Sequence, residues 1–258
     1  MKLLAADYDG TIRYARHIMD EDIEALHRWK EAGNILAIVT GRSMESMMLQ
    51  QEMYHLPADY YITNNGGMVW DADGNKLNST YLNEIAALDI IYACREQPGV
   101  VSYVVNDGYN RHRIIVNDSL NERRYPNLKP DLTEEEVENL GKYAQIVLSM
   151  SDVLQAQHLA EQINIYFSDH VVAYPNNYVV DVVPQGISKL VGIEYVSAYS
   201  GVPEEDTYTI GDSFNDIPML EYGVHTAAME TAYQEVKDHA MYTYSSVSEM
   251  INTILDEE

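Results

Sequence analysis

The chain has 258 residues, of which 46% are hydrophobic, and its 41 acidic residues far outnumber its 16 lysines and arginines. The formal charge of −25 argues against nucleic acid and anionic membranes as partners, because both attract basic faces. The lone Cys94 excludes an internal disulfide and fits a reducing cytoplasm. The N-terminal apolar run is too short for a signal peptide, and no stretch approaches the roughly 20 apolar residues of a membrane span.

Strand-like and helix-like segments alternate over the first 80 residues. Strands are predicted at 2–6, 35–39 and 60–63, helices at 20–32 and 43–53, and a hairpin at 68–76. Asp20 is expected to cap the first helix and Gly33 to end it. This β-α-β-α-β order predicts a parallel sheet with helices on both faces.

The last third of the chain repeats that alternation, and the middle third differs from it. The last third is predicted to contain helices at 188–199, 216–221 and 247–255, with strands at 208–211, 224–227 and 241–244. The middle third is predicted to contain strands at 100–105, 113–116 and 178–183, with helices at 86–95, 133–140 and 151–162. The sequence therefore predicts a core domain of residues 1–80 and 185–258, interrupted by a separate α+β domain of residues 81–184.

Two carboxylates, Asp7 and Asp9, follow the first predicted strand, and Gly10 lets the chain turn away at once. Residues two apart in an extended segment point to the same side, so both carboxylates are expected to face one point. Carboxylates this close repel each other unless a cation or a shared proton lies between them. The pattern favours a divalent metal, with one carboxylate available as a nucleophile.

Three further polar motifs follow strands or open helices later in the chain. They are Thr40-Gly41-Arg42, Lys189, and the acidic segment Gly211-Asp212-Ser213-Phe214-Asn215-Asp216. Each has an ordinary structural interpretation, as a capped turn or a solvated lysine. Their occurrence in this order, at the sheet edge where ligands bind in open α/β folds, favours a single functional site.

With these four motifs, the chain resembles phosphatases of the haloacid dehalogenase superfamily, specifically the Cof-type branch with a type II (subclass IIB) cap. The branch's Asn-Gly before the hairpin is also present, as Asn65-Gly66, whereas Thr231 replaces an asparagine usual in a later loop. The resemblance implies an α/β fold with a Rossmann-like parallel-sheet core, helices on both of its faces, and an inserted α+β cap domain. The predicted domain 81–184 corresponds to that cap.

The resemblance also implies roles for the motif residues. Asp7 would be the nucleophile that forms an aspartyl-phosphate, and Asp9 would protonate the leaving group and then activate water. The implied cofactor is Mg²⁺, and its expected site consists of Asp7, Asp212, the carbonyl oxygen of Asp9, and Asp216 directly or through water. The residues expected to bind phosphate or substrate are Tyr8, Thr40, Gly41, Arg42, Lys189 and Asn215.

The implied function is Mg²⁺-dependent hydrolysis of a small phosphorylated metabolite, such as a sugar phosphate, by a cytoplasmic monomer or homodimer. A sugar phosphomutase and a non-catalytic phosphometabolite-binding protein are the alternatives, and a signalling receiver is disfavoured by the length of the chain. Basic residues of the middle domain form a further hypothesis, because they could face a second anionic group on the substrate. They are Arg111, Arg113, Arg123, Arg124 and Lys129.

Overall fold

The computed structural model describes residues 1–256, and these divide into two compact units. The first unit contains residues 1–42, residues 47–78 and the chain from Ser188 onward. The second unit contains residues 43–46 and 79–187. The sequence predicts joints near Ser79 and Pro184, and the units change at Ser79 and after Ile187. Among the described residues, no helix combines the length and the apolar character that crossing a membrane requires.

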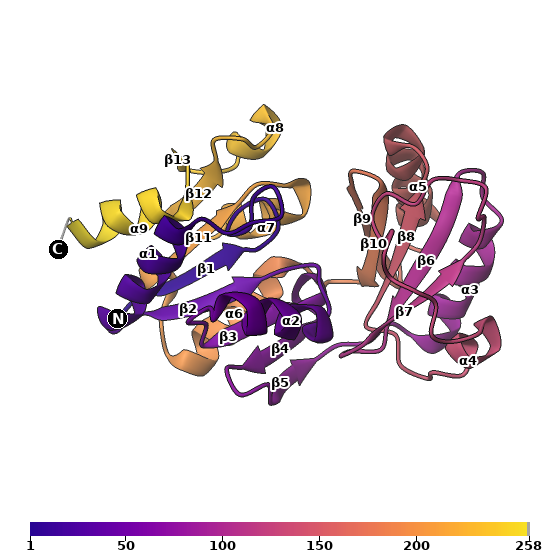
Figure 1. Cartoon of the computed structure of the whole chain (residues 1–258), viewed down its shortest axis with the longest axis horizontal. Coiled ribbons are helices and arrows are strands. Elements are labelled where there is room, and N and C mark those ends of the chain that lie inside the picture. The colour runs from indigo at the N-terminus through magenta and orange to yellow at the C-terminus, as the bar shows by residue number, and fades with distance from the viewer. Residues whose placement is uncertain (257–258) are drawn as a thin grey trace. The chain divides into compact units, whose positions relative to one another are not determined.

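The first unit is built on one large sheet (Figure 1). Within the described residues this sheet has eight strands, in the order β13-β12-β11-β1-β2-β3-β4-β5. The strands are β1 (Leu3–Asp7), β2 (Ile35–Val39), β3 (Tyr60–Thr63), β4 (Met68–Asp71), β5 (Lys76–Ser79), β11 (Thr207–Gly211), β12 (His225–Met229) and β13 (Tyr242–Tyr244). The run from β13 to β3 is parallel, and β4 is antiparallel to β3. The predicted parallel sheet is confirmed, with β4 and β5 added at one edge.

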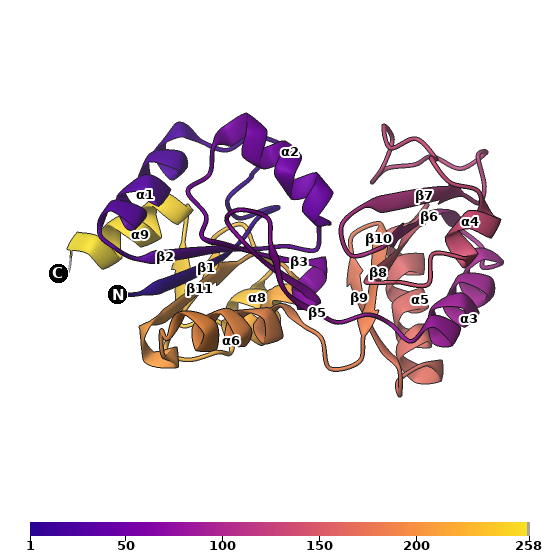
Figure 2. The same ribbon diagram turned by 90° about the horizontal axis from the view of Figure 1, so that it is seen from below.

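Helices cover both faces of this sheet, with α1 and α9 on one side and α6 on the other (Figure 2). The helices of this unit, which includes α2 from Met47 onward, are α1 (Asp20–Glu31), α2 (Met44–Tyr54), α6 (Lys189–Ser200), α7 (Ile217–Leu220), α8 (Gln234–Lys237) and α9 (Val247–Asp256). Leu3 and Ala5 of β1 belong to the same buried cluster as Ile193 and Val196 of α6. Their neighbours along the strand are buried as well, so β1 is apolar on both faces, as a central parallel strand requires.

The first helix starts differently from the sequence prediction. Asp20 is the first residue of α1, and Met19 occupies the N-cap position without a side-chain hydrogen bond, so the expectation that Asp20 caps this helix is wrong. Asp22 has the tertiary role instead, because its buried Oδ1 accepts a hydrogen bond of 2.8 Å from the Ser248 amide of α9. Gly33 follows the helix with a φ of 80°, as its predicted role as a stop requires.

The second unit has an antiparallel sheet of its own, with five strands in the described residues and the order β7-β6-β8-β10-β9. The strands are β6 (Val100–Asn106), β7 (Arg111–Ile115), β8 (Gln145–Met150), β9 (Val171–Asn176) and β10 (Val179–Pro184). The helices are α3 (Glu84–Arg95), α4 (Glu134–Glu138) and α5 (Val153–Tyr166). The sequence prediction missed β8 and β9, in which serine, proline and asparagine interrupt the apolar pattern.

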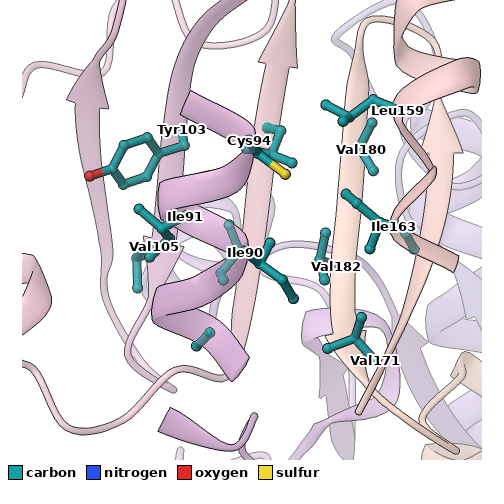
Figure 3. Close-up of a cluster of buried hydrophobic side chains, with 14 of the residues drawn as sticks. Ile90, Ile91, Cys94, Tyr103, Val105, Leu159, Ile163, Val171, Val180 and Val182 are labelled. Atoms are coloured by element: carbon teal, nitrogen blue, oxygen red, sulfur yellow. The ribbon is translucent and has the colours of Figure 1, made fainter. Parts of the chain in front are cut away.

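The core of the second unit lies between its sheet and its longer helices. Figure 3 shows Ile90 and Cys94 of α3, Ile163 of α5, and Val180 and Val182 of β10 within one buried cluster. Cys94 is therefore a buried core residue, as the sequence predicts.

Candidate active site

The first carboxylate, Asp7, is positioned by the alternation of β1. Leu3 and Ala5 pack on the α6 side of the sheet, and Asp7 is the next residue in that series at the carboxyl end of the strand. It meets Lys189, the first residue of α6, whose Nζ lies 2.6 Å from Asp7 Oδ1. The sequence predicts Lys189 within the first turn of a helix over 188–199, and in the structure α6 begins at this residue.

Lys189 has a second carboxylate partner, Asp216, whose Oδ1 lies 2.5 Å from Nζ. The lysine is only 2% exposed, and burial alone lowers the pKa of an ammonium group. Asp216 and Asp7 outweigh that effect and raise the pKa of Lys189 above its ordinary value. The side chain is therefore a permanent positive charge at the end of β1.

The acidic segment after β11 is held in shape by Asp216. Its Oδ2 accepts hydrogen bonds from the amides of Asp212 and Ser213, at 3.0 and 2.9 Å. Gly211 makes room for this arrangement, since a Cβ added there would lie 2.6 Å from Asp216 Cγ. Both oxygens of Asp216 thus have partners inside the protein, which suits a residue that orients its neighbours.

Three carboxylates, from Asp7, Asp212 and Asp216, each place one oxygen within 4.8 Å of the others. Burial raises the pKa of Asp7 well above its ordinary value, and repulsion by Asp216 and Asp212 adds to this against the attraction of Lys189. Burial and the Asp216 charge raise the pKa of Asp212 to about 6. One lysine cannot neutralise three carboxylates, so the site carries excess negative charge.

The excess charge and the ligand atoms fit a divalent cation. Asp7 Oδ2 is buried and receives no hydrogen bond, so it presents an unused ligand atom. Asp212 accepts a hydrogen bond of 3.3 Å from Thr11 Oγ1, and it lies so close to Gly10 that an added Cβ would be 2.3 Å from its Oδ2. Carboxylate oxygens in this number and spacing are the ligands that Mg²⁺ and Ca²⁺ prefer.

The second carboxylate of the first motif, Asp9, has different partners from Asp7. Arg42 donates to both of its oxygens, with Nε 2.6 Å from Oδ2 and Nη2 2.7 Å from Oδ1. Arg13 adds a contact of 3.3 Å to Oδ1. The chain leaves regular strand geometry after Asp7, so the expectation from alternation that both carboxylates face one point is not met by these contacts. The sequence prediction assigned Arg42 to phosphate, and the structure brings it to Asp9.

Tyr8, one of the residues predicted to bind substrate, is fully buried beneath Arg42. The guanidinium carbon lies 5.2 Å from the centre of the Tyr8 ring, within the range of a cation–π contact. The Tyr8 hydroxyl donates to Gln50 Oε1 at 2.9 Å, and its amide donates to the carbonyl of Val39. Both donors of Tyr8 are therefore used inside the protein, and its ring supports Arg42.

The loop after β2 contributes Thr40 and Gly41 to the same edge of the sheet. Thr40 is buried, and its Oγ1 accepts a hydrogen bond of 3.1 Å from the Arg42 amide, which leaves the hydroxyl hydrogen able to donate. Gly41 lies against the side chain of Asn65, to which a Cβ at position 41 would approach within 3.1 Å. Asn215 from the acidic segment reaches the same place, where its Nδ2 donates to Asn65 Oδ1 at 3.0 Å.

Asn65 is a polar residue at this edge for which the sequence predicts no role. The signal available in the sequence was the run Asn64-Asn65-Gly66 directly after a predicted strand, which is typical of a left-handed turn. Its contacts with Gly41 and Asn215 depend on three separate strand ends and are visible only in the folded chain.

The basic residues of the second unit have partners of their own. Arg113 is 7% exposed, and its guanidinium contacts Glu122 at 3.1 Å and the Leu128 carbonyl at 2.9 Å. Arg123 lies over the ring of Tyr178 and donates to its hydroxyl at 3.0 Å. These contacts favour a structural role for Arg113 over the proposed contact with a substrate anion.

Comparison with known proteins shows the family to which this chain belongs. The model of a family described as haloacid dehalogenase-like hydrolase matches residues 4–255. One similar protein is the 5-amino-6-(5-phospho-D-ribitylamino)uracil phosphatase YitU of Bacillus subtilis, 27% identical over 256 residues, which cover 96% of this chain and 93% of YitU.

Solved structures share the fold over the full length of the chain. A HAD/COF-like hydrolase from Plasmodium vivax superposes with a TM-score of 0.86 at 18% identity, covering 100% of this chain and 96% of that one. The HAD subclass IIB sugar phosphatase BT4131 superposes with a TM-score of 0.79 at 22% identity, covering 100% and 98% of the two chains.

Proposed function

The chain is a phosphatase of the haloacid dehalogenase-like hydrolase family, and we propose that it hydrolyses small phosphorylated metabolites through an aspartyl-phosphate formed on Asp7. The observation that carries the proposal is the buried contact of Lys189 with Asp7 and Asp216, at 2.6 and 2.5 Å, beside Asp212. A phosphomonoester dianion resists attack by an anion, so the site must supply positive charge and alignment. Lys189 supplies a fixed charge next to the attacking oxygen.

In the proposed reaction an Asp7 oxygen attacks phosphorus as the bond from phosphorus to the leaving oxygen breaks. Asp9 in its protonated form gives its proton to that leaving oxygen, and the resulting carboxylate takes a proton from the water that hydrolyses the aspartyl-phosphate. Phosphate leaves and Asp7 returns to its carboxylate form. Arg42 and Arg13 hold the Asp9 carboxylate in place, so Arg42 acts in this proposal as a positioning residue for the proton shuttle.

The proposed cofactor is Mg²⁺, held by Asp7, Asp212 and the carbonyl oxygen of Asp9, with Asp216 orienting the loop that carries Asp212. When bound, the cation neutralises negative charge on the phosphoryl group. The orphaned Asp7 Oδ2 and the raised pKa values of Asp7 and Asp212 support a cation at this place. The proposed phosphate contacts are Thr40, Gly41, Lys189 and Asn215, and Tyr8 supports Arg42 from below.

The proposed substrates are small soluble phosphate esters, in particular sugar or sugar-alcohol phosphates. Two similar proteins support this class, since one is named for a phosphoribityl-aminouracil and the other is called a sugar phosphatase. A cytoplasmic location is part of the proposal, because Cys94 is a buried thiol without a disulfide. A panel of phosphorylated metabolites that includes the phosphoribityl-aminouracil would rank the substrates, and gel filtration would distinguish a monomer from a homodimer.

The deciding experiment is hydrolysis of p-nitrophenyl phosphate with and without Mg²⁺, by the wild type and by Asp7→Asn. We expect phosphate release that needs the metal and that falls by at least about 10³-fold in the variant. Asp73→Asn, at an exposed hairpin residue of the same unit, is the matched control and should retain full activity. A wild type that binds phosphate esters without turnover would contradict the proposal and favour a binding protein. A sugar phosphate isomerised without phosphate release would favour a mutase.

A further inference from the structure

A left-handed turn connects three of the four motif segments of the site. Asn64, Asn65 and Gly66 have φ values of 53°, 54° and 100°, a run of positive values that is rare for residues other than glycine. All three are buried, and the turn directly follows β3. Strained backbone of this kind persists only where the surroundings hold it, and it is concentrated at functional sites.

The backbone of the turn is fastened to the loop after β2 and to the start of α6. The Asn64 amide donates to the Arg42 carbonyl at 2.9 Å, and the Asn65 amide donates to the Thr40 carbonyl at 3.0 Å. Gly66 packs so tightly on the Ser188 carbonyl that an added Cβ would lie 1.9 Å from its oxygen. The turn therefore fixes the place of Thr40 relative to the residue that precedes Lys189.

The Asn65 side chain extends this connection to the acidic segment. Its Oδ1 accepts the hydrogen bond of 3.0 Å from Asn215 Nδ2, and both its oxygen and its nitrogen lie beside Gly41. The side chain is 1% exposed, yet its Nδ2 has no hydrogen-bond partner. A buried amide without an acceptor is costly, and an acceptor supplied by a ligand removes that cost.

We infer that Asn65 is a further phosphate-binding residue: its Nδ2 donates to a phosphoryl oxygen held beside Gly41, while its Oδ1 positions Asn215. This inference rests on the proposed phosphatase function. Gly41 and Asn215 are already proposed phosphate contacts, and the unpartnered Nδ2 lies beside Gly41 on the side chain whose Oδ1 binds Asn215. A Cβ at position 41 would crowd the Asn65 amide, with 3.1 Å to its oxygen and 3.2 Å to its nitrogen, so glycine leaves room for a phosphoryl oxygen there.

Two variants distinguish the loss of the Asn65 Nδ2 donor from a change in the left-handed turn. Asn65→Asp keeps an oxygen acceptor for Asn215 and tolerates positive φ, but it replaces the donor with a negative charge. Asn65→Gly keeps the left-handed backbone and removes the whole side chain. The matched controls are Asn177→Asp and Asn177→Gly, made at an exposed turn residue with a φ of 52° in the second unit.

The readouts are the inhibition constant of inorganic phosphate, kcat and KM for p-nitrophenyl phosphate, and the thermal midpoint. For Asn65→Gly we expect the phosphate inhibition constant and KM to rise at least tenfold, and for Asn65→Asp further still. The thermal midpoint should stay within a few degrees of the wild type, and both Asn177 variants should behave as wild type. A phosphate inhibition constant within twofold of wild type in Asn65→Gly would overturn the inference, even if kcat or stability fell.

Calorimetric titration with inorganic phosphate keeps this test separate from the test of the proposed function. If the wild type is inactive but binds phosphate, and Asn65→Gly weakens that binding, the inference stands and the phosphatase proposal fails. If the wild type is active and both Asn65 variants bind phosphate as it does, the phosphatase proposal stands and the inference fails.

Discussion

Each unit places a carboxylate next to a basic side chain, and the buried Asp7 and the partly buried Glu122 have opposite electrostatics. In the second unit Glu122 accepts hydrogen bonds from Ser102, Ser149 and Arg113 and from two backbone amides. Burial alone raises the pKa of Glu122, but these hydrogen bonds outweigh it and the pKa is lowered. In the first unit burial and two neighbouring carboxylates raise the pKa of Asp7, despite its contact with Lys189.

This difference distinguishes a structural charge from a functional one. The oxygens of Glu122 are both occupied by donors within its own unit, so nothing further is needed to stabilise its charge. Asp7 keeps one buried oxygen without a donor and lies in a group with excess negative charge. Both carboxylates form a salt bridge and are at least partly buried. Of the two, Asp7 is the one that needs further positive charge.

Among the variants that test this comparison, Lys189→Met is expected to have the largest effect, a loss of catalysis. Removal of the ammonium takes away the charge that offsets Asp7 during attack, so kcat/KM should fall by about 10²- to 10³-fold. Steady-state hydrolysis of p-nitrophenyl phosphate at saturating Mg²⁺ measures it. Lys30→Met is the matched control, because Lys30 pairs with Asp59 at a partly exposed position of the same unit. A loss smaller than about tenfold would show that Lys189 has a mainly structural role.

The next largest effect is expected for Arg113→Met in the second unit, which should lower the free energy of unfolding. Loss of the guanidinium takes one charged donor from the partly buried Glu122, which keeps its other donors, so the free energy of unfolding should fall by about 2 kcal/mol. Chemical denaturation measures this, and turnover per folded molecule should stay within about twofold of wild type. Arg123→Met, at an exposed cation–π contact, should cost less than about 1 kcal/mol. A changed preference between mono- and bisphosphorylated substrates would instead indicate that Arg113 contacts substrate.

A smaller effect is expected on the pH dependence of stability without metal. The pKa of Asp212 is raised to about 6 in the folded chain. At pH values between the ordinary pKa of an aspartate and about 6, the folded state therefore binds more protons than the unfolded state. This contribution to stability is full below the ordinary pKa and is lost as the pH rises through about 6. Thermal midpoints in EDTA should therefore fall from pH 5 to pH 7, and Mg²⁺ should stabilise more at pH 7. Asp212→Asn should reduce the fall of the thermal midpoint with pH. An equal fall in that variant would contradict the assignment of this pH dependence to Asp212.

The smallest effect concerns the overall charge. A chain at −25 repels an anionic substrate at long range, whereas Lys189 and a bound cation attract it locally. Salt screens the long-range part first, so kcat/KM at saturating Mg²⁺ should rise slightly or stay level as ionic strength increases. A steep fall with salt would show that local attraction dominates over the net charge of the protein.

Much of the first unit was predictable because its signals are local. The apolar runs and the polar residues that follow them identify the strand ends, and the resemblance supplied Asp7, Asp9, Lys189 and Asp212 in their order. The second unit was predicted less completely, since β8 and β9 contain polar residues and a proline that hide their pattern. Their burial depends on pairing with β6 and β10, which no local window shows.

The sequence by itself determined the fold class, the family and the residues at each strand end, because periodicity and motifs depend on residues that are close together in the chain. Only the tertiary structure decided how those residues pair. It assigned Arg42 to Asp9, buried the donors of Tyr8, and brought Asn65 between Gly41 and Asn215. These contacts join residues far apart in the chain, and their geometry is fixed by strand order and packing, which a sequence pattern does not contain.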